Sequence, residues 1–102
     1  MKRGGKSSYI REVLRDYPKI CKKIPEKRTR NEQRRVESVE RMLEQVDQLP
    51  DAKEKMQLIK LVYFSESHNL YGAAMKLYIS LRTAVRWNHE ILCIAADSMD
   101  LM

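Results

Sequence analysis

Two arginines four residues apart, Arg82 and Arg86, are the side chains in this sequence that could do the most specific chemistry. Each guanidinium presents a rigid fork of N–H donors, which fits either the edge of a guanine or a phosphate group. On a helix, a spacing of four residues places both forks on one face. The sequence does not choose between reading guanine and clamping phosphate.

Side chains around the two arginines are predicted to join the same anion-binding face. The Ser80 and Thr83 hydroxyls lie at a predicted helix start, where free backbone N–H groups bind phosphate. Val85 could touch a thymine methyl group, and Lys76 would reach the DNA backbone from the preceding helix. Asn88 is an additional candidate further along the helix. The predicted DNA-contacting residues are Lys76, Ser80, Leu81, Arg82, Thr83, Val85, Arg86 and His89.

A helix, a tight turn and a second helix are predicted to position these side chains. The first helix ends near Leu77, the turn runs through Tyr78 and Ile79, and Ser80 caps the second helix. Small residues in the first helix, at 73 and 74, would let the two helices cross closely. Three- and four-residue spacing predicts a buried stripe on the second helix, made of Ala84, Trp87, Ile91 and Ile94.

The run AAxxLxISxRTxxRW, over about fifteen positions, resembles the pattern of many bacterial and phage DNA-binding helix-turn-helix domains. The resemblance implies that the second helix enters the major groove of double-stranded DNA. One position departs from the pattern. The turn usually holds a glycine in a left-handed conformation, and this chain has Tyr78 there.

Composition favours an all-α protein and argues against an enzyme. The 102 residues include three Gly and three Pro, and no apolar run is long enough to cross a membrane. Cys21 and Cys93 are far apart and are expected to be reduced thiols. No metal-ligand spacing, nucleophile–base pair or phosphate-binding glycine loop is visible. The sequence therefore predicts no catalytic activity, no metal and no cofactor. The basic N-terminus lacks the apolar core of a signal peptide, so a cytoplasmic location is expected.

Positive charge is concentrated in the first third of the chain. Residues 1–35 carry thirteen Lys or Arg and four Asp or Glu, a net charge of +9, whereas the whole chain has +6. Residues 36–102 are therefore net negative, at −3. Because phosphate neutralisation supplies most of the raw affinity of a DNA-binding protein, this basic end is the predicted electrostatic contact. The alternative is a charged segment that is merely solvated.

Three segments are predicted along the chain: a basic arm with short helices at 1–25, a long polar helix at 26–49 and a helix-turn-helix domain at 50–102. The arm would begin as a flexible tail over residues 1–8 and hold a helix from about Tyr9 to Asp16, with Pro18 starting a new turn. The long helix has an apolar seam at 36, 39, 43 and 46, which predicts packing on the helix-turn-helix or a dimer seam. Asp51 and Glu54 are predicted to cap the next helix, at 52–64.

From Leu49 onward the order of features resembles the promoter-reading C-terminal helix-turn-helix of sigma factors. These features are LP, a helix ending in LVYF, a short polar loop, then AAxxLxIS and RTxxRW, over about residues 49–90. With the preceding IREVLRDYPKICKKI, the chain resembles small phage and prophage transcriptional regulators of the RinA and ArpU type. That resemblance implies activation of phage or prophage late genes, with RNA polymerase as a possible partner.

Two other classes of function stay open. A small terminase subunit also uses a helix-turn-helix, but it packages phage DNA. An adaptor without DNA binding would dock its Leu81 and Val85 face against a protein. Residues 51–90 hold six cations and four acids, a modest excess for a DNA reader. Multimer size would separate these classes, since a ring favours packaging, and a monomer or homodimer favours regulation.

Overall fold

Five α-helices and two short helical turns make up the computed structural model, which describes residues 3–99, with side chains from Ser8 onward. In chain order they are α1 (Arg3–Cys21), the 3₁₀ turn η1 (Pro25–Lys27), α2 (Arg30–Asp47), α3 (Ala52–Ile59), the π-helical turn η2 (Lys60–Phe64), α4 (Leu70–Lys76) and α5 (Leu81–Ser98). No strand occurs in that range, and the predicted all-α class is confirmed. None of these helices combines the length and apolar character that a bilayer crossing requires.

Helix α1 is longer than predicted at both ends. It begins at Arg3 and continues through Pro18 to Cys21, so residues 3–8 are helical and not a flexible tail. Residues 1–2 lie outside the described range. Proline removes one backbone hydrogen bond but does not have to end a helix. Here Leu14 before Pro18 and Ile20 after it are both buried, and packing on each side keeps the helix continuous.

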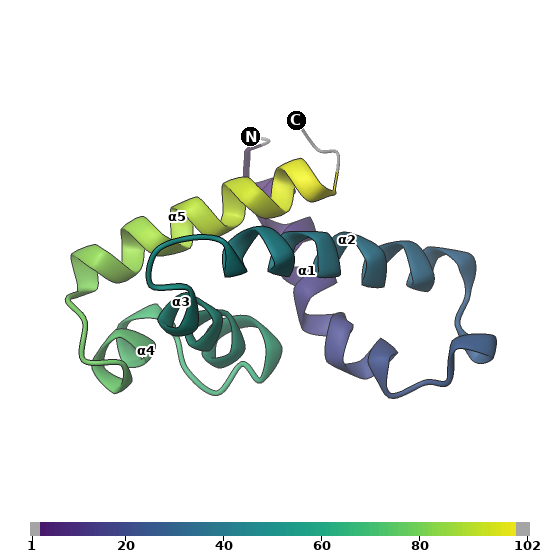
Figure 1. Cartoon of the computed structure of the whole chain (residues 1–102), viewed down its shortest axis with the longest axis horizontal. Coiled ribbons are helices and arrows are strands. Elements are labelled where there is room, and N and C mark those ends of the chain that lie inside the picture. The colour runs from purple at the N-terminus through teal and green to yellow at the C-terminus, as the bar shows by residue number, and fades with distance from the viewer. Residues whose placement is uncertain (1–2, 100–102) are drawn as a thin grey trace.

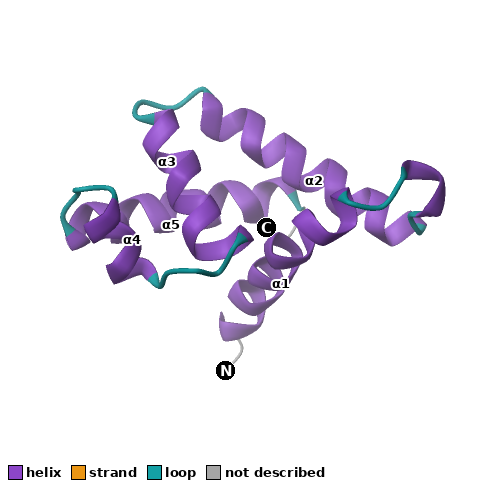
Figure 2. Ribbon diagram, turned by 90° about the horizontal axis from the view of Figure 1, so that it is seen from below, coloured by secondary structure: helices purple, strands orange, loops and turns teal. Residues whose placement is uncertain are grey.

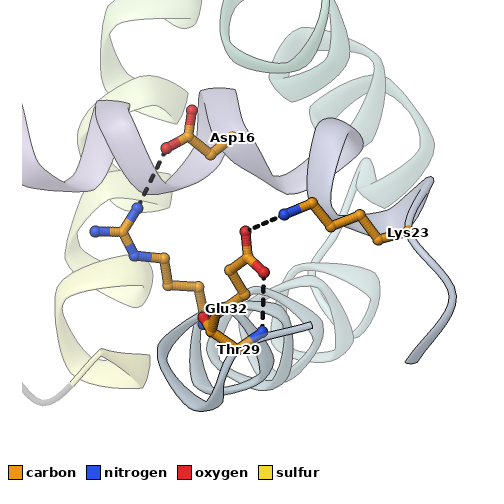
Figure 3. A network of polar contacts seen from close by, with 5 residues as sticks. Asp16, Lys23, Thr29 and Glu32 are labelled. Atoms are coloured by element: carbon orange, nitrogen blue, oxygen red, sulfur yellow. Dashed lines mark hydrogen bonds and ion pairs between the residues drawn. The ribbon is translucent and has the colours of Figure 1, made fainter. Parts of the chain in front are cut away.

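Helix α2 begins at Arg30, four residues later than predicted, because a capping box sets its start. The Thr29 hydroxyl accepts a hydrogen bond from the Glu32 backbone N–H at 3.1 Å, and the Glu32 carboxylate accepts one from the Thr29 N–H at 3.0 Å. Lys23 of the preceding segment donates to the same carboxylate at 2.7 Å (Figure 3). These bonds, the one from Lys23 above all, lower the pKa of Glu32. The residues before them form η1 and not a frayed helix end.

The start of α3 also differs from the prediction. Asp51 stands at the N-cap in a left-handed conformation, with φ 57°, and its side chain accepts no capping hydrogen bond. Asp tolerates this region better than most residues, so Asp51 serves the sharp turn after Pro50 instead of the helix end. The predicted helical stretch to Phe64 is otherwise present, with its last turn widened into η2.

One apolar core joins all the α-helices, so residues 50–102 share their interior with the N-terminal half. The core draws on Leu14 of α1, Val39 and Met42 of α2, Ile59 of α3, and α4 and α5. Helix α2 lies along α5 (Figure 1), which bears out packing of the long helix on the C-terminal helices. Its buried side chains are Val36, Val39, Met42 and Val46, so Met42 takes the place expected for the half-buried Leu43.

Candidate nucleic-acid interface

Helix α4, a three-residue turn and α5 lie where the sequence placed them. Helix α4 ends in a Schellman motif: the Ile79 N–H donates to the Ala74 carbonyl at 3.0 Å, and the Tyr78 N–H to the Met75 carbonyl at 3.2 Å. This motif requires a left-handed residue directly after the C-cap of the helix. That residue is Tyr78, with φ 60°. Tyr78 therefore occupies the left-handed turn position at which the resembled helix-turn-helix pattern usually has glycine.

Ser80 opens α5 as predicted. Its hydroxyl oxygen accepts a hydrogen bond from the Thr83 N–H at 3.1 Å, and its proton is donated to the Thr83 hydroxyl oxygen at 2.9 Å. Both predicted phosphate-binding hydroxyls are therefore engaged with each other. What remains for an anion is the proton of the Thr83 hydroxyl and the N-terminal backbone N–H groups of α5.

The two faces of α5 separate as predicted, with one change. Ala84, Trp87 and Ile91 are buried, but Ala95 continues the buried stripe where Ile94 was expected, and Ile94 is half-buried. A helix advances 3.6 residues per turn, so a stripe followed over three turns drifts onto the i+4 position. The opposite face is exposed and holds Leu81, Arg82, Val85, Arg86 and His89.

Close approach of α4 to α5 depends on two alanines. Ala73 and Ala74 are buried, as the predicted crossing requires, while Lys76 is exposed on the outer side of α4. Asn88, considered above for base contact, turns inward and accepts a hydrogen bond from the Tyr63 hydroxyl. Burial raises the pKa of Tyr63, so this hydroxyl stays a donor at neutral pH. Asn88 is thus a structural residue.

A buried lysine that sequence reasoning did not single out fixes α5 against α3. Lys55 is 4% exposed. Its ammonium lies 2.9 Å from the Glu90 carboxylate and 5.5 Å from the centre of the Trp87 ring. An ammonium is stable in an apolar core only when it is paired, and the carboxylate and the indole face supply partners. The only sequence signal was a cation on the apolar side of the predicted helix at 52–64.

His89 and Cys93 lie one turn apart on the exposed side of α5, with the ring nitrogen 3.7 Å from the sulfur. Cys21 is also a free thiol. Within the described residues, no group of three or more potential ligands could hold a metal ion.

Five apolar side chains between residues 71 and 85 are exposed. On α4, Tyr71 and Met75 are 59% and 61% exposed, and Tyr78 in the turn is 95% exposed. Leu81 and Val85 are exposed on α5, on the same helix face as the two arginines. Side chains of this kind meet thymine methyl groups and sugars in a DNA complex, or apolar side chains in a protein complex.

Replacing Tyr78 with glycine is expected to stabilise the protein by about 0.5–1 kcal/mol, because glycine adopts positive φ without a steric penalty. The Schellman hydrogen bonds use only backbone atoms, and the exposed ring contributes no packing. Urea unfolding measures the change. The control is Tyr71→Gly, which removes another exposed ring, 59% exposed, from the helical backbone of α4 and should lower stability by up to about 1 kcal/mol. Equal losses in the two variants would contradict a left-handed Tyr78.

The fold and this interface define an all-α protein in which a capped helix presents two arginines alongside exposed apolar side chains. Comparison with family models, curated proteins and solved structures found no match.

Proposed function

We propose that this chain is a sequence-specific DNA-binding transcriptional regulator that reads the major groove with α5. The observation that carries the proposal is the exposed face of α5, where Arg82, Val85 and Arg86 stand outward above an inner face anchored by Trp87. The chain holds no Asp or Glu between Ser67 and His89, so no carboxylate from this stretch opposes a phosphate. A helix N-terminus at Ser80 adds a partial positive charge at the same end.

Regulation of phage or prophage late genes is the part of this proposal that rests on resemblance. The LP, LVYF, AAxxLxIS and RTxxRW order supports a sigma-like role, in which the protein would act beside RNA polymerase at a promoter. The exposed apolar surface of Tyr71, Met75 and Tyr78 is available for a protein contact while α5 occupies the groove. A homodimer would extend recognition to two half-sites one helical turn apart.

A protein adaptor is the second candidate, and the same apolar surface favours it. Five exposed apolar side chains within one short stretch are more than a purely electrostatic DNA contact requires. On this alternative, Leu81 and Val85 dock against a protein. A DNA-reading regulator would bind a specific duplex on its own, whereas an adaptor would bind a protein and no specific duplex.

Selection from a randomised pool of DNA duplexes tests the proposal. The pure chain is incubated with duplexes carrying a random window of about 20 base pairs, and bound molecules are amplified over several rounds. A DNA-reading protein should enrich one motif, and the enriched site should be bound at least about a thousandfold more tightly than a scrambled duplex. An unenriched pool would reject the proposal and leave the adaptor.

A further inference from the structure

Eight cations and two carboxylates lie between residues 19 and 35, where α1 ends, η1 turns and α2 begins. We call this segment, residues 19–35, the basic tip. Its exposed cations are Lys19, Lys22, Lys23, Lys27, Arg30 and Arg34. Among the side chains that the structure describes, the ion pairs at the tip use only Lys23, with Glu32, and Arg35, with Asp16. Outside these pairs, five exposed cations are available to an external anion: Lys19, Lys22, Lys27, Arg30 and Arg34.

The tip is held in place and is not a loose charged tail. Lys23 bonds across to Glu32 at 2.7 Å, and Arg35 of α2 pairs with Asp16 of α1 at 3.2 Å (Figure 3). The capping box at Thr29 fixes the backbone between them. Because these contacts tie the segment after α1 and α1 itself to α2, the backbone that carries the exposed cations is held in place before any ligand binds, which lowers the entropy cost of binding.

The basic tip and the start of α5 lie at opposite ends of the molecule. The two ends are separated along the longest axis, whose extent is 42 Å (Figures 1 and 2). One turn of B-form DNA is about 34–36 Å long. A duplex running along this axis could therefore meet α5 in one major groove and the basic tip about one turn away.

The geometry points to a second, sequence-independent contact. We propose that the basic tip holds the phosphate backbone of the same duplex about one turn to one side of the groove that α5 reads. This inference rests on the proposed function and deepens it. Residues 36–102 are net negative at −3, so that part of the chain, α2 included, attracts DNA weakly and the tip supplies the missing phosphate neutralisation.

Salt dependence tests the contact without knowledge of the target site. The probe is a duplex of about 30 base pairs of arbitrary sequence, because phosphate contacts carry no sequence information. The test variant is Lys22→Gln with Lys27→Gln, at two exposed lysines outside the ion pairs of the tip. The control is Lys53→Gln with Lys60→Gln, which removes two exposed lysines from α3 and η2. Circular dichroism verifies that both variants keep the helical fold.

Loss of two phosphate contacts should reduce the slope of log affinity against log salt by about 1.8. Between about 50 and about 200 mM salt, the wild type should therefore lose roughly tenfold more affinity than the tip variant. The control should keep the wild-type slope. Equal slopes for the tip variant and the control would overturn the inference.

The length of DNA on either side of the enriched site tests whether the tip contacts the duplex on one side of that site only. Duplexes are extended by about one turn on the left or on the right of that site. For the wild type, extension on one side only should raise affinity, and in the tip variant neither extension should matter. If both sides act alike, or if the tip variant keeps the asymmetry, the inference fails. An enriched site without flank dependence would leave the proposed function intact, whereas an unenriched pool would reject that function itself.

Discussion

Replacing Arg82 and Arg86 together with alanine is expected to abolish site-specific DNA binding while the helical circular-dichroism signal stays unchanged. Both side chains are exposed on α5, and no hydrogen bond or ion pair within the described residues involves them, so the fold does not need them. A bidentate arginine–guanine contact contributes about 1–3 kcal/mol of discrimination, so losing two should lower specific affinity at least about thirtyfold. Binding titrations on the enriched site and on a scrambled duplex measure the effect.

The matched control is Arg11→Ala with Arg15→Ala, which removes two exposed arginines at the same four-residue spacing from α1. It changes the net charge equally, and the exposed Arg15–Glu66 ion pair at 3.7 Å that it removes should contribute little stability, so a difference in DNA binding between the two double variants comes from position. A loss confined to the enriched site indicates that Arg82 and Arg86 read bases, and an equal loss on both duplexes indicates that they clamp phosphate. If the double variant at 82 and 86 still protects the same site, the groove assignment is wrong.

The turn and α5 could be predicted because their determinants are local. Ser80 indicates a helix start because its own side chain caps the helix. The three- and four-residue spacing of Ala84, Trp87 and Ile91 indicates a buried face, whichever element covers that face. The left-handed conformation at position 78 was suggested only by the resemblance, whose usual glycine is replaced by tyrosine in this chain. Ile94 was wrongly placed in the buried stripe. Alternating steps of three and four residues do not show where the stripe moves on by one residue, here from 94 to Ala95.

The N-terminal half was predicted less well, for two different reasons. The start of α2 could have been predicted, because Thr29 followed by Glu32 is a capping-box signature. It was missed because the predicted helix at 26–49 also includes the polar residues from Glu26 to Arg28. The continuity of α1 through Pro18 could not, since it depends on the packing of Leu14 and Ile20 against other helices. The position of the basic tip, far from the start of α5 (Figure 1), follows from the tertiary arrangement and cannot be read from the composition.

Removing the Glu90 carboxylate is expected to destabilise the protein far more than removing its partner Lys55. Glu90→Ala leaves the Lys55 ammonium buried without its counter-charge and should lower the free energy of unfolding by about 3 kcal/mol. Lys55→Met fills the same space with an apolar chain. The Glu90 side chain is 42% exposed and keeps its hydration, so this change should stay within about 1 kcal/mol of the wild type. Urea unfolding followed by Trp87 fluorescence measures both.

The double variant Lys55→Met with Glu90→Ala separates loss of the pair from loss of Glu90 itself. If the cost of Glu90→Ala is the stranded ammonium, removing that ammonium should restore most of the stability. The cost should also persist at about 1 M salt, because buried charges are screened much less than exposed ones. A double variant as unstable as Glu90→Ala would show that Glu90 stabilises α5 by another route. Because Trp87 lies beneath the same ammonium on the inner side of α5, the pair also holds the inner face of α5 against α3.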